Sequence, residues 1–193
     1  NSGDFKKGEL SITWKGVESM NESSYLHLIN NLCSYDDIRH LNIGFFHGGT
    51  LFPCLDGGNT PEVFAIDNFF TDAGVKSIFL NNMKTLGYEG RFTLFDDNCL
   101  SFDVTKISTK INFYIYDADH SEEAQHFAVT HFDPAMDDVF ILMIDDFSSP
   151  NPRNGTMRAI EEMKYIVHHS RILEGSPWHC GQGIFVLEKT IHD

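Results

Sequence analysis

The sequence predicts an α/β protein with a doubly wound, seven-stranded, mostly parallel sheet and helices on both faces. Short apolar runs alternate with amphipathic stretches along most of the chain. Two of the runs, 111–116 and 139–144, are apolar apart from Asn112, as expected for central parallel strands that are covered on both faces. No helical pattern separates the last two predicted strands, so we expect the final strand to run antiparallel to the others.

The elements are expected in a regular order within a single domain, residues 1–193. Residues 1–17 are polar and mixed, which indicates an N-terminal arm, and residues 18–35 carry apolar side chains at helical spacing. The core is expected over 38–189. Its predicted strands are 38–44, 63–66, 92–95, 111–116, 139–144, 165–173 and 184–188. Helices are expected between the first six strands, and the ranges assigned to them are 50–55, 72–86, 121–132 and 156–163.

Capping residues support two of these helices. Gly87 is a typical stop for the helix 72–86. Ser121 is a suitable N-cap for the helix 121–132, and Glu122 and Glu123 are favourable in its first turn. The Pro-rich segment 150–152 is expected to be a loop on the active face of the sheet.

Composition excludes several classes of protein. The chain has 193 residues, 41% of them hydrophobic, which is enough for one packed core and rules out a disordered tail or a collagen-like rod. The formal net charge of −14 disfavours nucleic acid and anionic lipid as partners. The sequence contains no run of 18 apolar residues, so no membrane span is expected.

Cysteine usage indicates a reducing compartment. Cys33, Cys54, Cys99 and Cys180 lie in separate segments and form no CxxC pair, so we expect four free thiols and a cytoplasmic location.

The turn after the first predicted strand has the composition of a ligand-binding loop. Gly44 follows the strand, and Gly48-Gly49 is expected to open a helix whose free N–H groups face a ligand. The spacing is GxxxGG rather than GxGxxG, which disfavours NAD. A tight turn without a ligand is the alternative.

Polar residues also follow the second and third predicted strands. Asp67 and Asn68 stand some twenty residues after the glycines, where an acid commonly receives ribose hydroxyls. Asp97 and Asn98 end the third strand at the same edge. Taken singly, each of these residues could cap a helix or lie in a solvated loop, but together they mark one face of the sheet.

Acids at the ends of strands four and five predict a cation site. Asp117 follows one strand, and Asp145 and Asp146 follow the next. Three clustered carboxylates repel one another unless a hard cation such as Mg²⁺ lies between them. His120 stands beside them and is a candidate general base, with a capping or hydrogen-bonding role as the alternative.

Taken together, these motifs resemble class I S-adenosylmethionine-dependent methyltransferases, most closely the small, metal-dependent O-methyltransferase-like group. The matching stretches run in the family's order from about residue 38 to 189. They are 42–50, 65–68, 116–121, 144–147 and 153–156. The resemblance implies a Rossmann-like, seven-stranded sheet with an antiparallel last strand.

The resemblance also implies roles for individual residues. Gly44 and Gly48 would line the methionine part of S-adenosylmethionine, Asp67 would hold its ribose, and Asn98 would lie near its adenine. The remaining cofactor contacts are assigned to Asn42, Gly49, Thr50, Asn68, Asp97 and Asp117. Asp117, Asp145 and Asp146 would bind Mg²⁺ or another divalent cation. Three residues depart from the family pattern. Asn42 and Asn98 stand where the family commonly has an acid, and Ala118 stands where it usually has a glycine.

The activity expected from this resemblance is methyl transfer to a hydroxyl of a small molecule such as a sugar or natural product. His120, or a cation-bound carboxylate such as Asp117, would remove the hydroxyl proton. Arg153 and Asn154 are candidate substrate contacts, with a loop clamp and an Asn154-Gly155 turn as the alternative. Trp178 and His179 are further candidates, with simple packing as the alternative for Trp178.

Two other functions stay open. One is a metal-dependent hydrolase, which would have no need for a ribose-binding acid at Asp67. The other is a catalytically degenerate domain of the same fold that binds a nucleoside or a partner. The sequence also leaves open a homo-oligomer.

Overall fold

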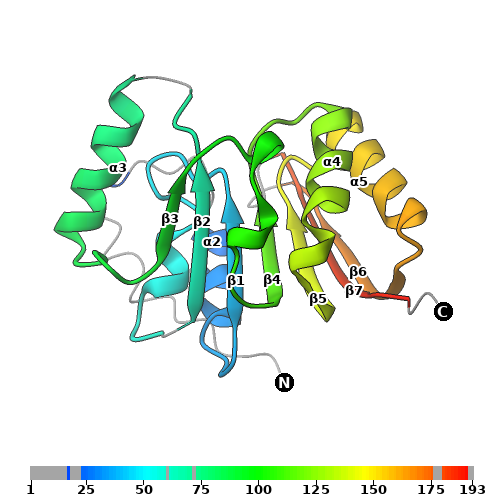
Figure 1. Cartoon of the computed structure of the whole chain (residues 1–193), viewed down its shortest axis with the longest axis horizontal. Coiled ribbons are helices and arrows are strands. Elements are labelled where there is room, and N and C mark those ends of the chain that lie inside the picture. The colour runs from blue at the N-terminus through cyan, green and yellow to red at the C-terminus, as the bar shows by residue number, and fades with distance from the viewer. Residues whose placement is uncertain (1–16, 18–22, 60, 71–72, 176–179, 191–193) are drawn as a thin grey trace.

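The sheet contains seven strands in the order β3-β2-β1-β4-β5-β7-β6 (Figure 1). This computed structural model describes residues 17, 23–59, 61–70, 73–175 and 180–190. Strand β7 runs antiparallel to both β5 and β6, and the other neighbouring pairs are parallel, as the sequence predicts. The strands are β1 Arg39–Ile43, β2 Glu62–Asp67, β3 Thr93–Asp96, β4 Ile111–Tyr116, β5 Met136–Ile144, β6 Ile166–Leu173 and β7 Gln182–Glu188.

Helices cover both faces of the sheet. The α-helices are α2 Ser23–Leu32, α3 Ala73–Thr85, α4 Glu122–Phe132 and α5 Pro150–Glu162. One apolar core joins α4 and α5 to Tyr114 and Tyr116 of β4. A second core joins α2 and α3 to Phe113 and Ile115 of the same strand. Successive side chains of a strand point to opposite faces, which is why one strand supplies both cores.

The same alternation decides which face the acids after the strands occupy. Ile115 of β4 and Met143 of β5 pack in the core beneath α2 and α3. Asp117 and Asp145 each lie two residues further along, so they continue that face beyond the edge of the sheet. The two strands pair in parallel register up to Tyr116 and Ile144, which brings the two acids side by side.

Short 3₁₀ turns replace two of the expected helices. The predicted helix 50–55 is a single turn, η1 Phe52–Leu55, with a proline in its first positions. The β3–β4 connection contains only η2 Cys99–Ser101 and η3 Val104–Lys106, although the sequence predicts helices between the first six strands. One further turn, η4 Asp133–Ala135, leads into β5.

The boundaries of three other elements also differ from the prediction. Helix α5 starts at Pro150, six residues before the predicted start, because proline suits the first turn of a helix, where no N–H bond is lost. Segment 150–152 is therefore the first turn of a helix and not a loop. Strand β5 begins at Met136 rather than at 139. The expected N-terminal helix 18–35 is described as α2 only, because 18–22 and most of the expected arm lie outside the described residues.

The four cysteines are free, as expected: Cys33 and Cys54 are buried, Cys99 is half-buried and Cys180 is exposed. None of the helices in the described part of the chain combines the length and the apolar character needed to cross a membrane.

Candidate active site at the carboxyl edge of the sheet

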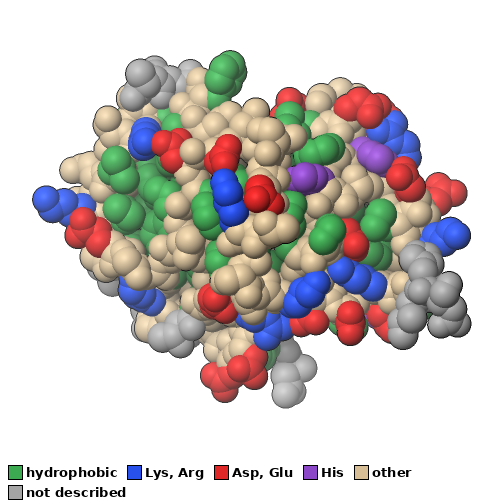
Figure 2. All heavy atoms as spheres, viewed as in Figure 1, with side chains coloured by type: hydrophobic (Ala, Val, Ile, Leu, Met, Phe, Trp, Pro, Cys, Tyr) green, Lys and Arg blue, Asp and Glu red, His purple; other side chains and the backbone are tan. Residues whose placement is uncertain are grey.

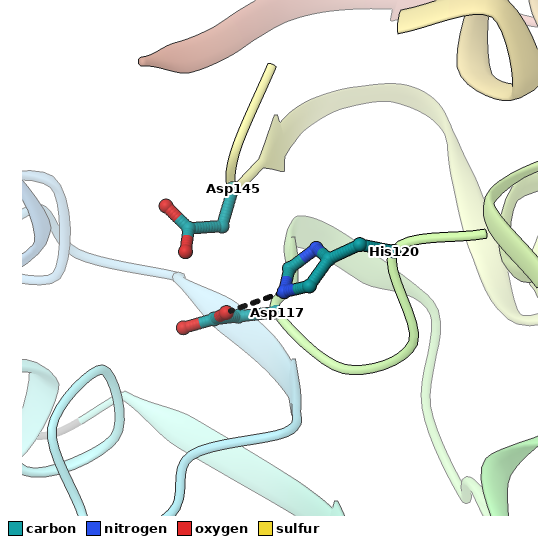
Figure 3. A group of neighbouring side chains, drawn as sticks. All are labelled: Asp117, His120 and Asp145. Atoms are coloured by element: carbon teal, nitrogen blue, oxygen red, sulfur yellow. Dashed lines mark ion pairs between the residues drawn. The ribbon is translucent and has the colours of Figure 1, made fainter. Parts of the chain in front are cut away.

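Asp117, His120 and Asp145 meet where strands β4 and β5 end (Figure 3). One ligand atom from each side chain lies within 4.8 Å of the other two. In Figure 3 the imidazole of His120 points toward Asp117, and the carboxylate of Asp145 lies next to this pair. The sequence predicts that Asp117 and Asp145 meet, and the structure adds His120 to them as a third potential ligand.

Asp146, the other predicted metal ligand, contacts the group through His120. The Nε2 atom of His120 lies 3.7 Å from Oδ2 of Asp146 and 4.0 Å from Oδ1 of Asp117. Asp146 adopts a left-handed backbone conformation, φ 53°, which turns the chain at the end of β5. His120 therefore lies between two carboxylates, those of Asp117 and Asp146.

Two buried polar residues of this site have no signal in the sequence analysis. Gln182, the first residue of β7, is 2% exposed, and its Nε2 donates a hydrogen bond to Oδ1 of Asp145. Tyr25 on α2 is 1% exposed, and its hydroxyl has no hydrogen-bond partner among the described residues. Burial, followed by the charges of Asp145 and Asp117, raises the pKa of Tyr25 above its ordinary value. Neither residue belongs to a local motif, so only the packing of distant segments reveals them.

The donor set suits a divalent cation. Two carboxylates and an imidazole are common ligands of Mn²⁺ and of similar ions, and the carboxylates also suit Mg²⁺. The unpartnered hydroxyl of Tyr25 near these acids is a second sign of a ligand-binding position, because buried polar groups normally have partners.

Asp67, the acid predicted to bind the ribose, accepts hydrogen bonds from the backbone of the glycine-rich turn after β1. Its Oδ2 accepts hydrogen bonds from the amides of Phe45 (3.0 Å) and Phe46 (3.3 Å), and its Oδ1 accepts one from Phe69 (2.7 Å). Asp67 thus ties the end of β2 to the turn after β1. Oδ1 has a second lone pair for a ligand, and ribose binding stays a prediction.

The glycine turn is closed by internal hydrogen bonds. The amides of Gly48 and Gly49 both donate to the carbonyl of Phe45, at 2.7 and 2.9 Å. The expectation of free N–H groups at a helix N-terminus is therefore wrong at these two residues. Gly44 has φ 74°, and a Cβ there would lie 2.1 Å from the carbonyl oxygen of Asp117. Glycine at 44 lets the first turn pass directly beside the acid.

Asn42 and Thr50 lie inside the protein. The hydroxyl of Thr50 donates to Oδ1 of Asn42 at 3.1 Å, and the amide of Asn42 lies 3.4 Å from the ring of His40. All three side chains are buried. The three side chains form a polar chain that holds the turn against β1, so the cofactor contacts predicted for Asn42 and Thr50 have no support in these side-chain positions.

The remaining predicted cofactor residues lie at the edge formed by β2 and β3. The side-chain oxygen of Asn68 accepts from the amide of Phe70, and that of Asn98 accepts from the amide of Leu100 as the N-cap of η2. Asp97 forms an ion pair with Lys106 at 3.5 Å. The hydrogen bond from Leu100 sets the orientation of the Asn98 side chain. The contact of Asn98 with adenine stays a prediction.

The predicted substrate residues are only partly described. Arg153 lies in the first turn of α5, where Nε donates to the carbonyl of Phe147 and a terminal nitrogen pairs with Glu174 at 2.9 Å. This is the clamp named above as the alternative. Asn154 is exposed within α5, so the alternative of an Asn154-Gly155 turn is wrong. Trp178 and His179 lie outside the described residues.

Two cavities lie at the opposite, amino edge of the sheet. One of about 620 Å³ is lined by residues that include Arg39 and Glu62, the first residues of β1 and β2. The other, of about 510 Å³, is lined by residues that include Lys110 and Ala135. Neither contains a predicted site residue. The charged groups at the carboxyl edge, rather than cavity size, mark the site, because open α/β sheets bind ligands at that edge.

No known protein-family model and no curated protein sequence matches the chain. Many solved structures do. A Staphylococcus aureus protein with a proposed caffeoyl-CoA O-methyltransferase assignment has a TM-score of 0.67 at 14% identity, with 92% of this chain and 90% of that chain covered. An O-methyltransferase from Bacillus cereus, in complex with S-adenosylhomocysteine, has a TM-score of 0.66 at 15% identity, with 93% and 88% covered.

A third structure, of Streptococcus pneumoniae Sp1610, has a proposed tRNA (m1A22) methyltransferase assignment and contains S-adenosylmethionine. Its TM-score is 0.62 at 15% identity, with 89% of this chain and 75% of that chain covered. The strand order and the antiparallel β7 agree with these similarities. The chain therefore has the fold of the class I S-adenosylmethionine-dependent methyltransferases, to which its motifs point.

Proposed function

We propose that this protein is an S-adenosylmethionine-dependent methyltransferase that methylates a hydroxyl of a small molecule, assisted by a divalent cation. The observation that carries the proposal is the group of Asp117, His120 and Asp145 at the carboxyl edge of a methyltransferase fold. Solved relatives in fold that hold S-adenosylmethionine or its product support the choice of cofactor.

Some residues of the site bind the cation, and another transfers the proton. Asp117 and Asp145 hold the cation, and Gln182 fixes the orientation of Asp145. When bound, the cofactor supplies an electrophilic methyl group, and the cation lowers the pKa of the acceptor hydroxyl. His120 accepts the hydroxyl proton at Nε2, where the carboxylates of Asp117 and Asp146 stabilise the positive charge.

Charge favours a small acceptor over a nucleic acid. The chain carries 28 acidic and 14 basic residues. On the face shown in Figure 2, the Lys and Arg side chains are mixed with Asp and Glu rather than gathered in a basic patch. A phosphate backbone needs concentrated positive charge, whereas a sugar or polyol needs hydrogen-bonding groups such as those at the carboxyl edge.

Calorimetric titration tests the cofactor and the cation separately. We expect S-adenosylhomocysteine to bind with a dissociation constant on the order of micromolar. We expect Mg²⁺ to bind the wild type and Asp145→Asn to weaken that binding by more than about 10-fold. Asp138→Asn is the matched control, because Asp138 is exposed on the same strand at its opposite end and should leave Mg²⁺ affinity unchanged.

Transfer itself is measured as formation of S-adenosylhomocysteine with a panel of sugars, polyols and catechols. His120→Asn should lower turnover while cofactor affinity stays the same, because the base acts only in the chemical step. Absence of nucleoside binding by the wild type would contradict the proposal. Cation binding without nucleoside binding would instead favour a metal-dependent hydrolase.

A further inference from the structure

Tyr25 is the buried polar residue near the site that the proposed mechanism does not use. Its side chain is 1% exposed, and its hydroxyl has no hydrogen-bond partner in the described part of the chain. A hydroxyl that is buried without a partner destabilises a protein, so such groups are uncommon unless a ligand completes their bonding. By contrast Tyr114, which is equally buried on the other face of the sheet, donates to the carbonyl of Ala128 at 3.2 Å.

Tyr25 packs on the face of the sheet that Asp117 and Asp145 continue beyond its edge. It belongs to the same apolar core as Phe45, Ile115 and Met143. Ile115 and Met143 each stand two residues before a site acid and on the same face, and Phe45 follows Gly44, which passes beside Asp117. Burial, followed by the charges of Asp145 and Asp117, raises the pKa of Tyr25, which agrees with its position on this face.

Hydrogen-bond chemistry restricts what can satisfy this hydroxyl. Asp117 and Asp145 only accept hydrogen bonds when ionised, and the Oε1 atom of Gln182 is a buried acceptor that also lacks a partner. A group with several O–H donors, such as a water or hydroxyl on a divalent cation, fits among these acceptors and can also accept from Tyr25.

We propose that the Tyr25 hydroxyl is a binding residue of this site and hydrogen-bonds to an oxygen ligand of the cation held by Asp117 and Asp145. The proposal rests on the cation site of the proposed function but not on its methyl donor. Helix α2 thereby contributes to the site, and binding of the cation removes the cost of an unpartnered hydroxyl.

Tyr25→Phe separates this role from a structural one, because the two roles predict opposite changes in the melting temperature of the ligand-free protein. Without a ligand, the variant should melt about 2–4 °C higher than the wild type, since it lacks the unpartnered hydroxyl. Its affinity for Mn²⁺ should be about 2- to 10-fold lower. Mn²⁺ is the probe because it accepts the same oxygen ligands as Mg²⁺ and is detected by electron paramagnetic resonance.

Tyr114→Phe is the matched control. It removes a hydroxyl that has a partner, so its melting temperature should fall and its Mn²⁺ affinity should stay unchanged. A lower melting temperature for Tyr25→Phe, or an unchanged Mn²⁺ affinity, would overturn the proposal, as would a wild type that binds no Mn²⁺. Failure of the wild type to bind S-adenosylhomocysteine would contradict the methyltransferase proposal alone, because Mn²⁺ is titrated without the nucleoside.

Discussion

At the scale of single residues, several polar side chains are buried in the core next to the site. His40 is fully buried in the central strand β1, stacks on Phe113 and bonds to its carbonyl through Nδ1 at 3.1 Å. Burial lowers the pKa of His40 from its ordinary 6.5 to about 4. His40 therefore supports the glycine turn through Asn42 only while the imidazole is neutral.

His40 predicts acid sensitivity of the fold. Above pH 6.5 the imidazole is neutral in both states and has no effect on the pH dependence of stability. Between pH 6.5 and about 4 only the unfolded chain takes up the proton, so stability falls as the pH falls, by about 3 kcal/mol at most. Urea denaturation at pH 7.5 and 5.0 measures this loss.

His40→Leu should remove that part of the pH dependence, and the exposed His168→Gln should retain it. An equal loss of stability in wild type and His40→Leu between these pH values would show that His40 takes up its proton equally in the folded and unfolded states.

At the scale of elements, the close approach of the β1 turn to the end of β4 positions Asp117. Asp117 donates its own amide to the carbonyl of Ile43 at 2.8 Å, and a Cβ at Gly44 would overlap its carbonyl oxygen. Any side chain at 44 must therefore separate the first turn from the candidate cation ligand.

Gly44→Ala tests this approach, with Gly87→Ala as the matched control. Both glycines have nearly the same φ, 74° and 72°, but no atom lies within 4 Å of a Cβ at 87. Both variants therefore carry a similar backbone penalty. The extra loss of unfolding free energy in Gly44→Ala measures the steric overlap with Asp117, which we expect to cost about 1–3 kcal/mol. Gly44→Ala should also weaken Mg²⁺ binding. Equal destabilisation of the two variants would mean that the β1 turn moves aside without cost.

At the scale of the whole molecule, the net charge of −14 opposes the compact state through self-repulsion. Salt screens charges that are separated by more than about 10 Å at 0.1 M. Raising NaCl from 20 to 500 mM should therefore raise the melting temperature, by about 2–4 °C for each kcal/mol of repulsion relieved. A lower melting temperature in high salt would show that the surface ion pairs, such as Arg158 with Glu122 and Glu123, stabilise the fold more than the excess charge destabilises it.

The sequence by itself determined the order of the elements, the antiparallel last strand and the edge at which the polar residues gather. These follow from the period of apolar residues and from the chain connectivity, which are local properties. The meeting of Asp117 with Asp145 follows as well, since neighbouring parallel strands end at one edge. The length of the helix after Gly48-Gly49 and the start of α5 did not follow, because a proline fits a 3₁₀ turn, a loop or a first helical turn equally well.

Only the tertiary structure decided which polar groups these acids and turns contact. Asp67 turns back to the amides of Phe45 and Phe46, Gln182 reaches Asp145, and the buried hydroxyl of Tyr25, on the same face of the sheet as the acids, has no partner among the described residues. Each relation joins residues between 21 and 37 positions apart or rests on the packing of a helix against the sheet. A local sequence pattern carries no record of such contacts, because they depend on how whole elements pack and on which hydrogen-bond partners burial leaves available.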